Sequence, residues 1–289
     1  MDMELYECES LDEFWHAISP IGSIFNDPAY TYLYRGHRDS EWKLSPLAYR
    51  KDVIEKYKTG MMQALVDHPD QTFFEFSLLQ GYIYYCDQRG LPVPGDSPSF
   101  REFFTLPRVM NTHGIDNSAW PLDSVLPLMA AAQHHGIPTR LLDWSHNAMV
   151  ASYFAAAGAI TKATSKDRGG KFAVYGFACN MHMTNGPYRY VHVPGSTSPN
   201  IPAQSGCFLL VSNSGRRGEK FTPDVCLEDR LMGAERLKKI TLPVVLAGEL
   251  LMRLYKFGVS AGSIYPGYDG AAKAVLEWNL AQSFTERLG

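Results

Sequence analysis

The stretch LMAAAQHHGIPTRLLDWSHNAMVASYFA, residues 128–155, decides how the middle of this chain folds. In the first third of this stretch apolar residues recur at helical spacing, which predicts a helix. Gly136 followed by Pro138 ends that helix. Residues 139–144 then suit a short strand bounded by turn residues. A second helix follows, with an apolar and aromatic face. The order helix, turn, strand, helix gathers several reactive side chains on short connections between rigid elements.

Working outward, the composition is that of an ordinary soluble globular protein, with 289 residues of which 45% are hydrophobic and 20% charged. The net charge of −3 and the isoelectric point near 6.3 indicate no overall attraction to nucleic acid or to anionic membranes. Five Cys residues without a CxxC pair argue against a disulfide framework or a thiolate zinc site. The expected compartment is the reducing cytoplasm, and no apolar run approaches the roughly 18 residues of a membrane span.

Helices are expected mainly in the first half of the chain and strands in the second. A capping box at Ser10 and Glu13 opens the first helix. The order predicts an α+β fold with a mixed or largely antiparallel sheet, in a single domain (1–289) with a helical insertion around 50–122. Strands are expected at Thr31 to Tyr34, 171–179, 188–193, 206–212, 237–242 and Ser263 to Tyr265.

Several blocks of this sequence resemble the FRG domain family, which is named after an aromatic, Arg, Gly triplet. The triplet here is Tyr34-Arg35-Gly36, and AQHHGIPTRLLDWS is the second block. The segments WKLSPLAYR, PNIPAQSGCFLL and LYKFGVSAGSIYPGYDGAAKAV resemble the remaining blocks, so the resemblance runs from about Thr31 to about Leu276. FRG-like chains occur in settings that suggest phage defence or toxin systems, and the resemblance implies a similar setting here.

Arg35 is the first candidate for ligand binding. It follows a predicted strand and precedes Gly36, so its guanidinium can project from the end of the strand while Gly36 allows a phosphate to come close. Arg is suited to a bidentate grip on phosphate or carboxylate. The alternative is a structural ion pair with Asp143 or another carboxylate.

The second block supplies further candidates. Arg140 and Asp143 are three residues apart, which places their side chains on opposite faces of a strand, so each needs another partner. Asp143 could also cap the following helix. His134 and His135 point in different directions, so at most one faces a cleft. Because no HxxxH or HExxH spacing is present, no metal is expected.

The order of elements is similar to the Arg, Ser, Glu layout of ADP-ribosyltransferases, and this implies an ADP-ribosyltransferase-like fold with NAD as substrate. Arg35 would hold the NAD pyrophosphate and Ser145 would support the nicotinamide half. Gln204 stands where that family has a Glu, which orients the ribose and stabilises an oxocarbenium-like transition state. Gln cannot balance positive charge, so a carboxylate would come from elsewhere, such as Asp143. The sequence contains no GxSxG, Walker or GxGxxG motif, which would have indicated a hydrolase, an NTPase or a Rossmann fold.

Three hypotheses remain open. An NAD-consuming transferase or glycohydrolase predicts that Arg35, Ser145 and Gln204 converge on one cleft. A non-catalytic module would bind a small phosphate-bearing nucleotide or a protein partner. A structural account makes Arg35 part of a buried polar network with residues of the second block. Besides the three convergent residues, the expected ligand contacts are Tyr34, Gly36, His135, Thr139, Arg140, Asp143 and Trp144.

Overall fold

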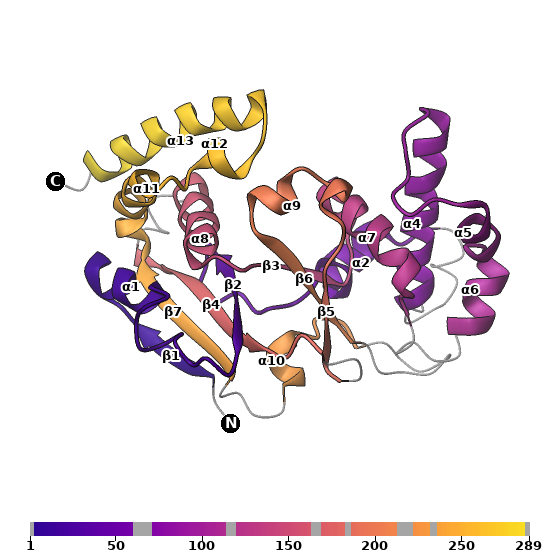
Figure 1. The fold of residues 1–289 in the computed structure, drawn as a ribbon, viewed down its shortest axis with the longest axis horizontal. Coiled ribbons are helices and arrows are strands. Elements are labelled where there is room, and N and C mark those ends of the chain that lie inside the picture. Colours follow the sequence, from indigo (N-terminus) through magenta and orange to yellow (C-terminus); the bar gives the residue numbers. More distant parts are fainter. Residues whose placement is uncertain are drawn as a thin grey trace.

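The computed structural model describes residues 3–59, 71–113, 120–162, 169–182, 186–212, 222–231 and 236–286. Within them, a seven-stranded sheet has the order β1-β7-β4-β2-β3-β6-β5 (Figure 1). The pair β1–β7 is parallel and every other pair is antiparallel, which confirms the expected mixed sheet. The strands are β1 (Glu4–Glu7), β2 (Thr31–His37), β3 (Leu141–Ser145), β4 (Lys171–Cys179), β5 (Tyr188–Val191), β6 (Gly206–Val211) and β7 (Leu237–Pro243).

Helices cover the two halves of the sheet as separate groups (Figure 1). The first group packs with β2, β4 and β7 around one apolar core and consists of α1 (Leu11–Ile18), α8 (Ala148–Lys162), α11 (Ala247–Lys256), α12 (Ala261–Ile264) and α13 (Tyr268–Glu286). The second group packs against β3, β5 and β6 and consists of α4 (Gln71–Gln88), α5 (Pro98–Phe103), α6 (Leu106–His113) and α7 (Leu126–His134). A third core lies on the other face of the sheet, beside η1 (Leu47–Tyr49), α2 (Lys51–Tyr57) and α10 (Leu227–Arg230).

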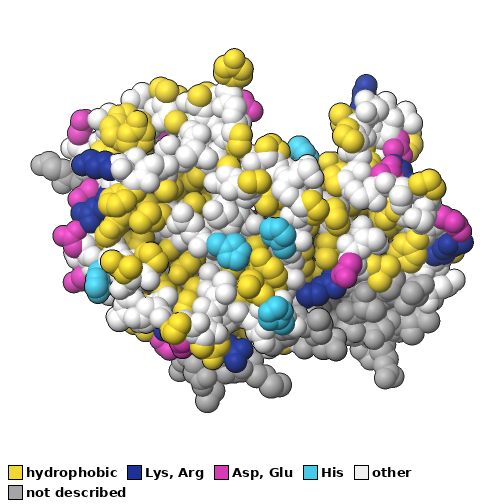
Figure 2. All heavy atoms as spheres, in the orientation of Figure 1, with side chains coloured by type: hydrophobic (Ala, Val, Ile, Leu, Met, Phe, Trp, Pro, Cys, Tyr) yellow, Lys and Arg dark blue, Asp and Glu magenta, His cyan; other side chains and the backbone are white. Residues whose placement is uncertain are grey.

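Among the described residues on the face seen in Figure 2, Lys, Arg, Asp and Glu side chains do not gather in a broad patch of one charge. Figure 2 shows that hydrophobic and His side chains occupy its middle, whereas Lys, Arg, Asp and Glu side chains stand mainly toward its edges. A notch separates α12 and α13 from α4 at its upper border. No helix among the described residues is long and apolar enough to cross a membrane.

Short-range sequence signals determine the ends of several helices. The Ser10 Oγ accepts a hydrogen bond from the Glu13 N–H at 3.3 Å, and the Glu13 carboxylate accepts from the Ser10 N–H, so the capping box is present. Gly136 follows α7 with φ +90°, a conformation that Gly adopts without strain. The Asn147 Oδ1 accepts from the Met149 N–H at 2.9 Å, which makes Asn147 the cap of α8.

Three expectations about local structure were wrong. The strand expected at Ser263 to Tyr265 is replaced by α12, because Ser260 and Ser263 form a capping box that starts a helical turn. The strand β2 does not stop before Arg35 but continues to His37. Asp143 is not a helix cap, since it lies within β3.

The sheet is almost divided in two between β2 and β3. On one side β2 pairs with β4 along all of Thr31–His37, and on the other β3 pairs with β6 along all of Leu141–Ser145. Between them the only paired residues are Tyr34 and Ser145. The strands β2 and β3 therefore separate immediately beyond this pair. Backbone N–H and C=O groups that would be paired in a continuous sheet face an opening there.

Gly36 allows α8 to lie directly against β2 beside this opening. A Cβ at Gly36 would come within 1.9 Å of the Ala151 carbonyl oxygen and 2.8 Å of the Ala155 nitrogen, both of which are backbone atoms of α8. Backbone inside a helix cannot move aside locally, so a side chain at this position requires the helix and the strand to separate. The Gly of the triplet thus serves helix packing, whereas the sequence suggested room for a ligand.

Substituting Gly36→Ala is expected to destabilise the protein by about 1–3 kcal/mol or more, since overpacking against rigid backbone is costly. Gly81→Ala is the matched control, because a Cβ at Gly81 in α4 meets nothing within 4 Å. That substitution should stabilise α4 by roughly 0.5–1 kcal/mol. Urea denaturation of the two variants measures both effects, and changes of the same sign would contradict this account.

A buried ion pair between Arg140 and Glu75 fixes the start of β3 against α4. Both side chains are almost fully buried, and the Arg140 Nε donates to Glu75 Oε2 at 2.8 Å. The Arg140 Nη1 also donates to the Trp120 carbonyl at 2.8 Å, while Gln71 donates its amide N–H to Glu75 Oε1. Two opposite charges can be kept away from water because each is hydrogen-bonded in this way.

Removing one member of this pair is expected to cost about 3–5 kcal/mol, since Arg140→Met leaves the Glu75 carboxylate uncompensated. The double variant Arg140→Met/Glu75→Gln should recover part of that loss. As a control, Arg108→Met breaks an exposed pair with Glu102 and should cost about 0–1 kcal/mol. Denaturation midpoints of the variants test this order of stabilities. If Arg140→Met and Arg108→Met lower the free energy of unfolding equally, the account is wrong.

Candidate functional site

Two neighbouring cavities lie at the opening between β2 and β3, and we call them compartments. We call the first the tryptophan compartment, because Trp42 lines this cavity of about 340 Å³. We call the second the amide compartment, a cavity of about 280 Å³ that includes Asn200. The residues that line both, and therefore mark their junction, are Arg35, Arg50, Asp143 and Gln204.

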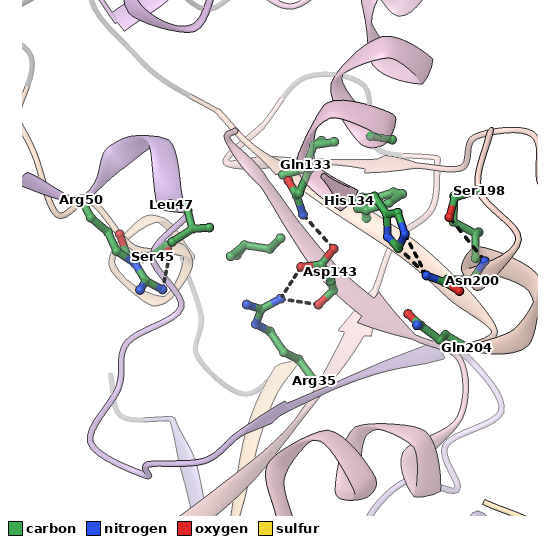
Figure 3. A pocket seen from close by; sticks show the side chains of 15 residues that line it. Arg35, Ser45, Leu47, Arg50, Gln133, His134, Asp143, Ser198, Asn200 and Gln204 are labelled. Carbon is green, nitrogen blue, oxygen red and sulfur yellow. Dashed lines mark hydrogen bonds and ion pairs between the residues drawn. The ribbon is translucent and has the colours of Figure 1, made fainter. Parts of the chain in front are cut away.

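Arg35 stands at this junction. Its position in β2 aims the side chain at the sheet face opposite to that of Asp143, so the guanidinium reaches through the gap between the strands. The Arg35 Nη1 donates to the Asp143 backbone carbonyl at 2.6 Å and lies 3.6 Å from the Asp143 carboxylate (Figure 3). Burial lowers the pKa of Arg35, and the charge of Asp143 partly offsets that effect. The cation is therefore held with little water around it.

His37 holds the other side of the Arg35 guanidinium. The Arg35 Nε–H donates to His37 Nε2 at 3.0 Å, so that nitrogen carries no proton. The proton of the neutral ring is then on Nδ1, which lies 3.2 Å from the Trp42 carbonyl and donates to it. Burial, reinforced by the charge of Arg35, lowers the pKa of His37 to about 3. The ring is thus a neutral acceptor that positions Arg35.

Asp143 is held in turn by a chain of hydrogen bonds from α7 and the start of β3. The Gln133 Nε2 donates to Asp143 Oδ1 at 2.7 Å (Figure 3). The Thr139 hydroxyl in turn donates to the Gln133 carbonyl oxygen. The Thr139 donor fixes which way the Gln133 amide faces. Asp143 keeps 65% of its side chain exposed, so one carboxylate oriented by Gln133 and Arg35 faces the pocket.

Positive charge exceeds negative charge in the pocket lining. Arg35, Arg38 and Arg50 contribute three guanidinium groups, whereas Asp143 is the one carboxylate among the described lining residues. Arg38 lies over the Trp42 ring, with its guanidinium carbon 4.4 Å from the ring centroid. Arg50 donates to the Ser45 carbonyl. Burial lowers the pKa of Arg50, an effect that nearby Asp52 and Asp224 partly offset.

The three residues expected to converge all line the tryptophan compartment, although they come from β2, β3 and the loop before β6. Ser145 is engaged with backbone, because its hydroxyl donates to the Gln204 carbonyl at 2.7 Å and accepts from the Asn147 N–H at 3.0 Å. The Gln204 side chain donates to the Ile264 carbonyl at 3.4 Å. The charged group of Arg35 therefore faces the pocket, whereas the Ser145 hydroxyl is used in hydrogen bonds to the backbone of the pocket wall.

The other expected ligand contacts divide into two sets. Tyr34, Gly36, Asp143 and Trp144 line the tryptophan compartment, and the buried indole N–H of Trp144 has no hydrogen-bond partner among the described residues. Arg140, His135 and Thr139 line neither compartment. Arg140 is held by Glu75, His135 stacks on Tyr82, and Thr139 acts on the pocket through Gln133.

Several lining residues were missed by the sequence analysis. Their signal was nevertheless present, because Trp42 and Arg50 are the first and last residues of WKLSPLAYR. In the same way Gln133 belongs to AQHHGIPTRLLDWS and Asn200 to PNIPAQSGCFLL. Within the residues that the structure describes, no group of three or more His, Cys, Asp or Glu side chains is placed to hold a metal ion.

Comparison with known families gives one match. The model of the FRG domain family matches residues 97–164, which reach from just before α5 to just after α8. The matched segment includes Gln133, Asp143 and Ser145 but not Arg35 or Gln204. No curated protein and no solved structure matches the chain.

The neutral state of His37 predicts a specific dependence of stability on pH. Between its folded pKa of about 3 and the ordinary value of 6.5, the unfolded chain binds a proton that the folded chain does not. The free energy of unfolding therefore falls as pH drops from 6.5 toward 3. His37→Gln keeps an acceptor for Arg35 without a titrating group. Its pH slope should be smaller than that of the wild type by up to about 1.4 kcal/mol per unit.

Urea denaturation at several pH values between 4 and 7, on the order of one unit apart, measures the two slopes. Parallel curves for the wild type and His37→Gln would show that the pKa of His37 is not lowered in the folded protein.

Proposed function

The chain carries an FRG domain, and from that premise we propose that the pocket between β2 and β3 binds a nucleotide-type ligand through its phosphates. The observation that carries this proposal is the excess of guanidinium groups over carboxylates in the lining. Guanidinium groups bind phosphate through paired, charge-assisted hydrogen bonds. The net charge of the whole chain is −3, so this positive site is a local feature.

The arrangement of Arg35 supports a role in binding in addition to its structural contacts. Its Nε and Nη1 are used by His37 and Asp143, while Nη2 has no hydrogen-bond partner among the described residues. The side chain keeps 18% of its surface exposed at the pocket. A group oriented on two sides and open on the third loses little freedom when a phosphate binds.

Aromatic side chains beside the arginines suit the base of a nucleotide. Trp42 and Phe154 both line the tryptophan compartment, and Trp42 is 38% exposed. Stacking of a base on an aromatic side chain contributes about 1–3 kcal/mol. Phosphate and base would thus be held by neighbouring groups of the same compartment.

NAD is the specific ligand that we propose. The reaction would break the bond between its ribose and nicotinamide, release nicotinamide, and join the ADP-ribosyl group to water or to another nucleophile. The layout similar to ADP-ribosyltransferases gives the pyrophosphate to Arg35 and the nicotinamide half to the wall that contains Ser145. Gln204 takes the place of the acid and can bind a ribose hydroxyl, while Asp143 is the carboxylate that can stabilise an oxocarbenium-like centre. An NAD-consuming reaction would suit a defence or toxin setting.

Nucleotide binding is tested by calorimetric titration of the purified protein with ADP. Arg35→Ala should weaken binding at least about tenfold, since a hydrogen bond to a charged group contributes about 1.5–3 kcal/mol. Arg189→Ala is the control, because Arg189 pairs with Asp123 and lines neither compartment. The proposal is wrong if the wild type does not bind ADP, or if Arg35→Ala binds ADP with the same affinity as the wild type.

The chemical step is tested separately by incubating the protein with NAD and following the release of nicotinamide. We expect release by the wild type and a loss of at least about 100-fold in Asp143→Asn, which removes the charge that stabilises the transition state. If ADP binds but nicotinamide release stays at background in both proteins, the pocket belongs to a non-catalytic binding module.

A further inference from the structure

We infer that a second site, where α11 and α13 meet, binds a primary alkylammonium group, such as the side chain of a lysine or the end of an aliphatic amine (Figure 1). The site is a small cavity whose polar and aromatic lining residues include Tyr153, Tyr255, Glu277 and Trp278. It shares no described lining residue with the two compartments beside β2 and β3. The inference therefore goes beyond the proposed function and does not depend on it.

The first observation is a half-buried carboxylate at the cavity. The Tyr153 hydroxyl donates to both oxygens of Glu277, at 2.8 Å from Oε1 and 2.7 Å from Oε2. Burial raises the pKa of Glu277, an effect that Tyr153 and the charge of Lys273 partly offset. A carboxylate has about four lone-pair positions, and one hydroxyl proton does not occupy them all. The carboxylate is therefore partly removed from water and still has acceptor positions that a cationic donor can use.

Lys273 is the cation nearest to Glu277 in the sequence of α13, one helical turn before it. Its Nζ lies over the ring of Tyr265, 3.8 Å from the ring centroid. Its charge acts on Glu277 from a distance, but within the described part of the chain no Lys, Arg or His side chain forms an ion pair with Glu277. The carboxylate is thus open to a cation from outside the chain.

The second observation is the aromatic wall. The rings of Tyr255 and Trp278 both line the cavity, and their centroids are 4.8 Å apart. The face of an aromatic ring attracts a cation within about 6 Å of its centroid, and Trp does so most strongly. The contact of Lys273 with Tyr265 is an example of this interaction beside the cavity. A carboxylate next to two such rings suits a cation better than a neutral group or an anion.

The third observation is size. The cavity has a volume of about 20 Å³, whereas roughly 10–15 Å³ is enough for one water molecule. An ammonium group is similar in size to water, so the cavity admits a primary ammonium group but not a trimethylammonium group. Tyr255 is 54% exposed, so the cavity lies at the surface. The apolar Leu251 and Val259 complete the lining and suit the methylene groups of an alkyl stem.

The test is an NMR titration of the wild type with n-butylammonium, and with two matched probes. n-Butanol has a similar shape without the charge, and tetramethylammonium has the charge but exceeds the cavity. Butylammonium should bind at least about tenfold more tightly than either, because hydrogen bonds to a charged group are strong. Glu277→Gln, which keeps an acceptor for Tyr153, should weaken butylammonium binding at least about tenfold. Glu249→Gln is the control, since it removes an exposed carboxylate of α11 outside the cavity.

Equal affinity of the wild type for butylammonium and n-butanol overturns the inference, and this comparison needs no variant. Unchanged butylammonium affinity in Glu277→Gln also overturns it, because the contact between Tyr153 and Glu277 would then serve only to join α8 to α13. Loss of binding in Glu277→Gln but not in Glu249→Gln supports the site. Acetyl-lysine methylamide then identifies the source of the ammonium group. Tighter binding than butylammonium supports a lysine of a partner chain, and equal or weaker binding supports a free amine.

Discussion

The pairing of Tyr34 with Ser145 is the constraint on which the rest of this structure depends. It is the one residue pair through which β2 and β3 join, and each of these two strands is paired along its whole length on its other side. Beyond it the strands separate, and the opening exposes polar groups that a continuous sheet would have covered. Gly36 keeps α8 against β2 at this point, so the opening lies beside a rigid wall.

The Arg35 side chain is hydrogen-bonded across this gap, with the neutral His37 on one side and the Asp143 carbonyl on the other. The same side chain therefore contributes to structure and lines the pocket, which combines two hypotheses that the sequence analysis treated as alternatives. The fully buried polar network of the fold is a different one, centred on Glu75 and Arg140. That network positions the start of β3 but lines neither compartment, whereas the exposed Asp143 lines both.

Much of the local structure and part of the site could be predicted from the sequence. Capping at Ser10 and the break at Gly136 are short-range effects, which depend on a few adjacent residues. The roles of Arg140 and His135 were harder to predict, because their partners Glu75 and Tyr82 lie in α4, more than 50 positions away in the chain for both pairs. No local pattern distinguishes an Arg that faces a pocket from one that is paired inside a core.

The sequence by itself determined the class of the fold and the similarity of residues 97–164 to the FRG domain family, and it led us to propose three residues that line one cavity. Periodicity, turn residues and block similarity carry that information along the chain. Only the tertiary structure decided that the sheet opens beside Tyr34, that Gly36 lies against a helix, and that three arginines and one carboxylate line the cavities at the opening. These features depend on which distant segments meet and on how much water remains between them, and neither quantity is encoded in the spacing of neighbouring residues.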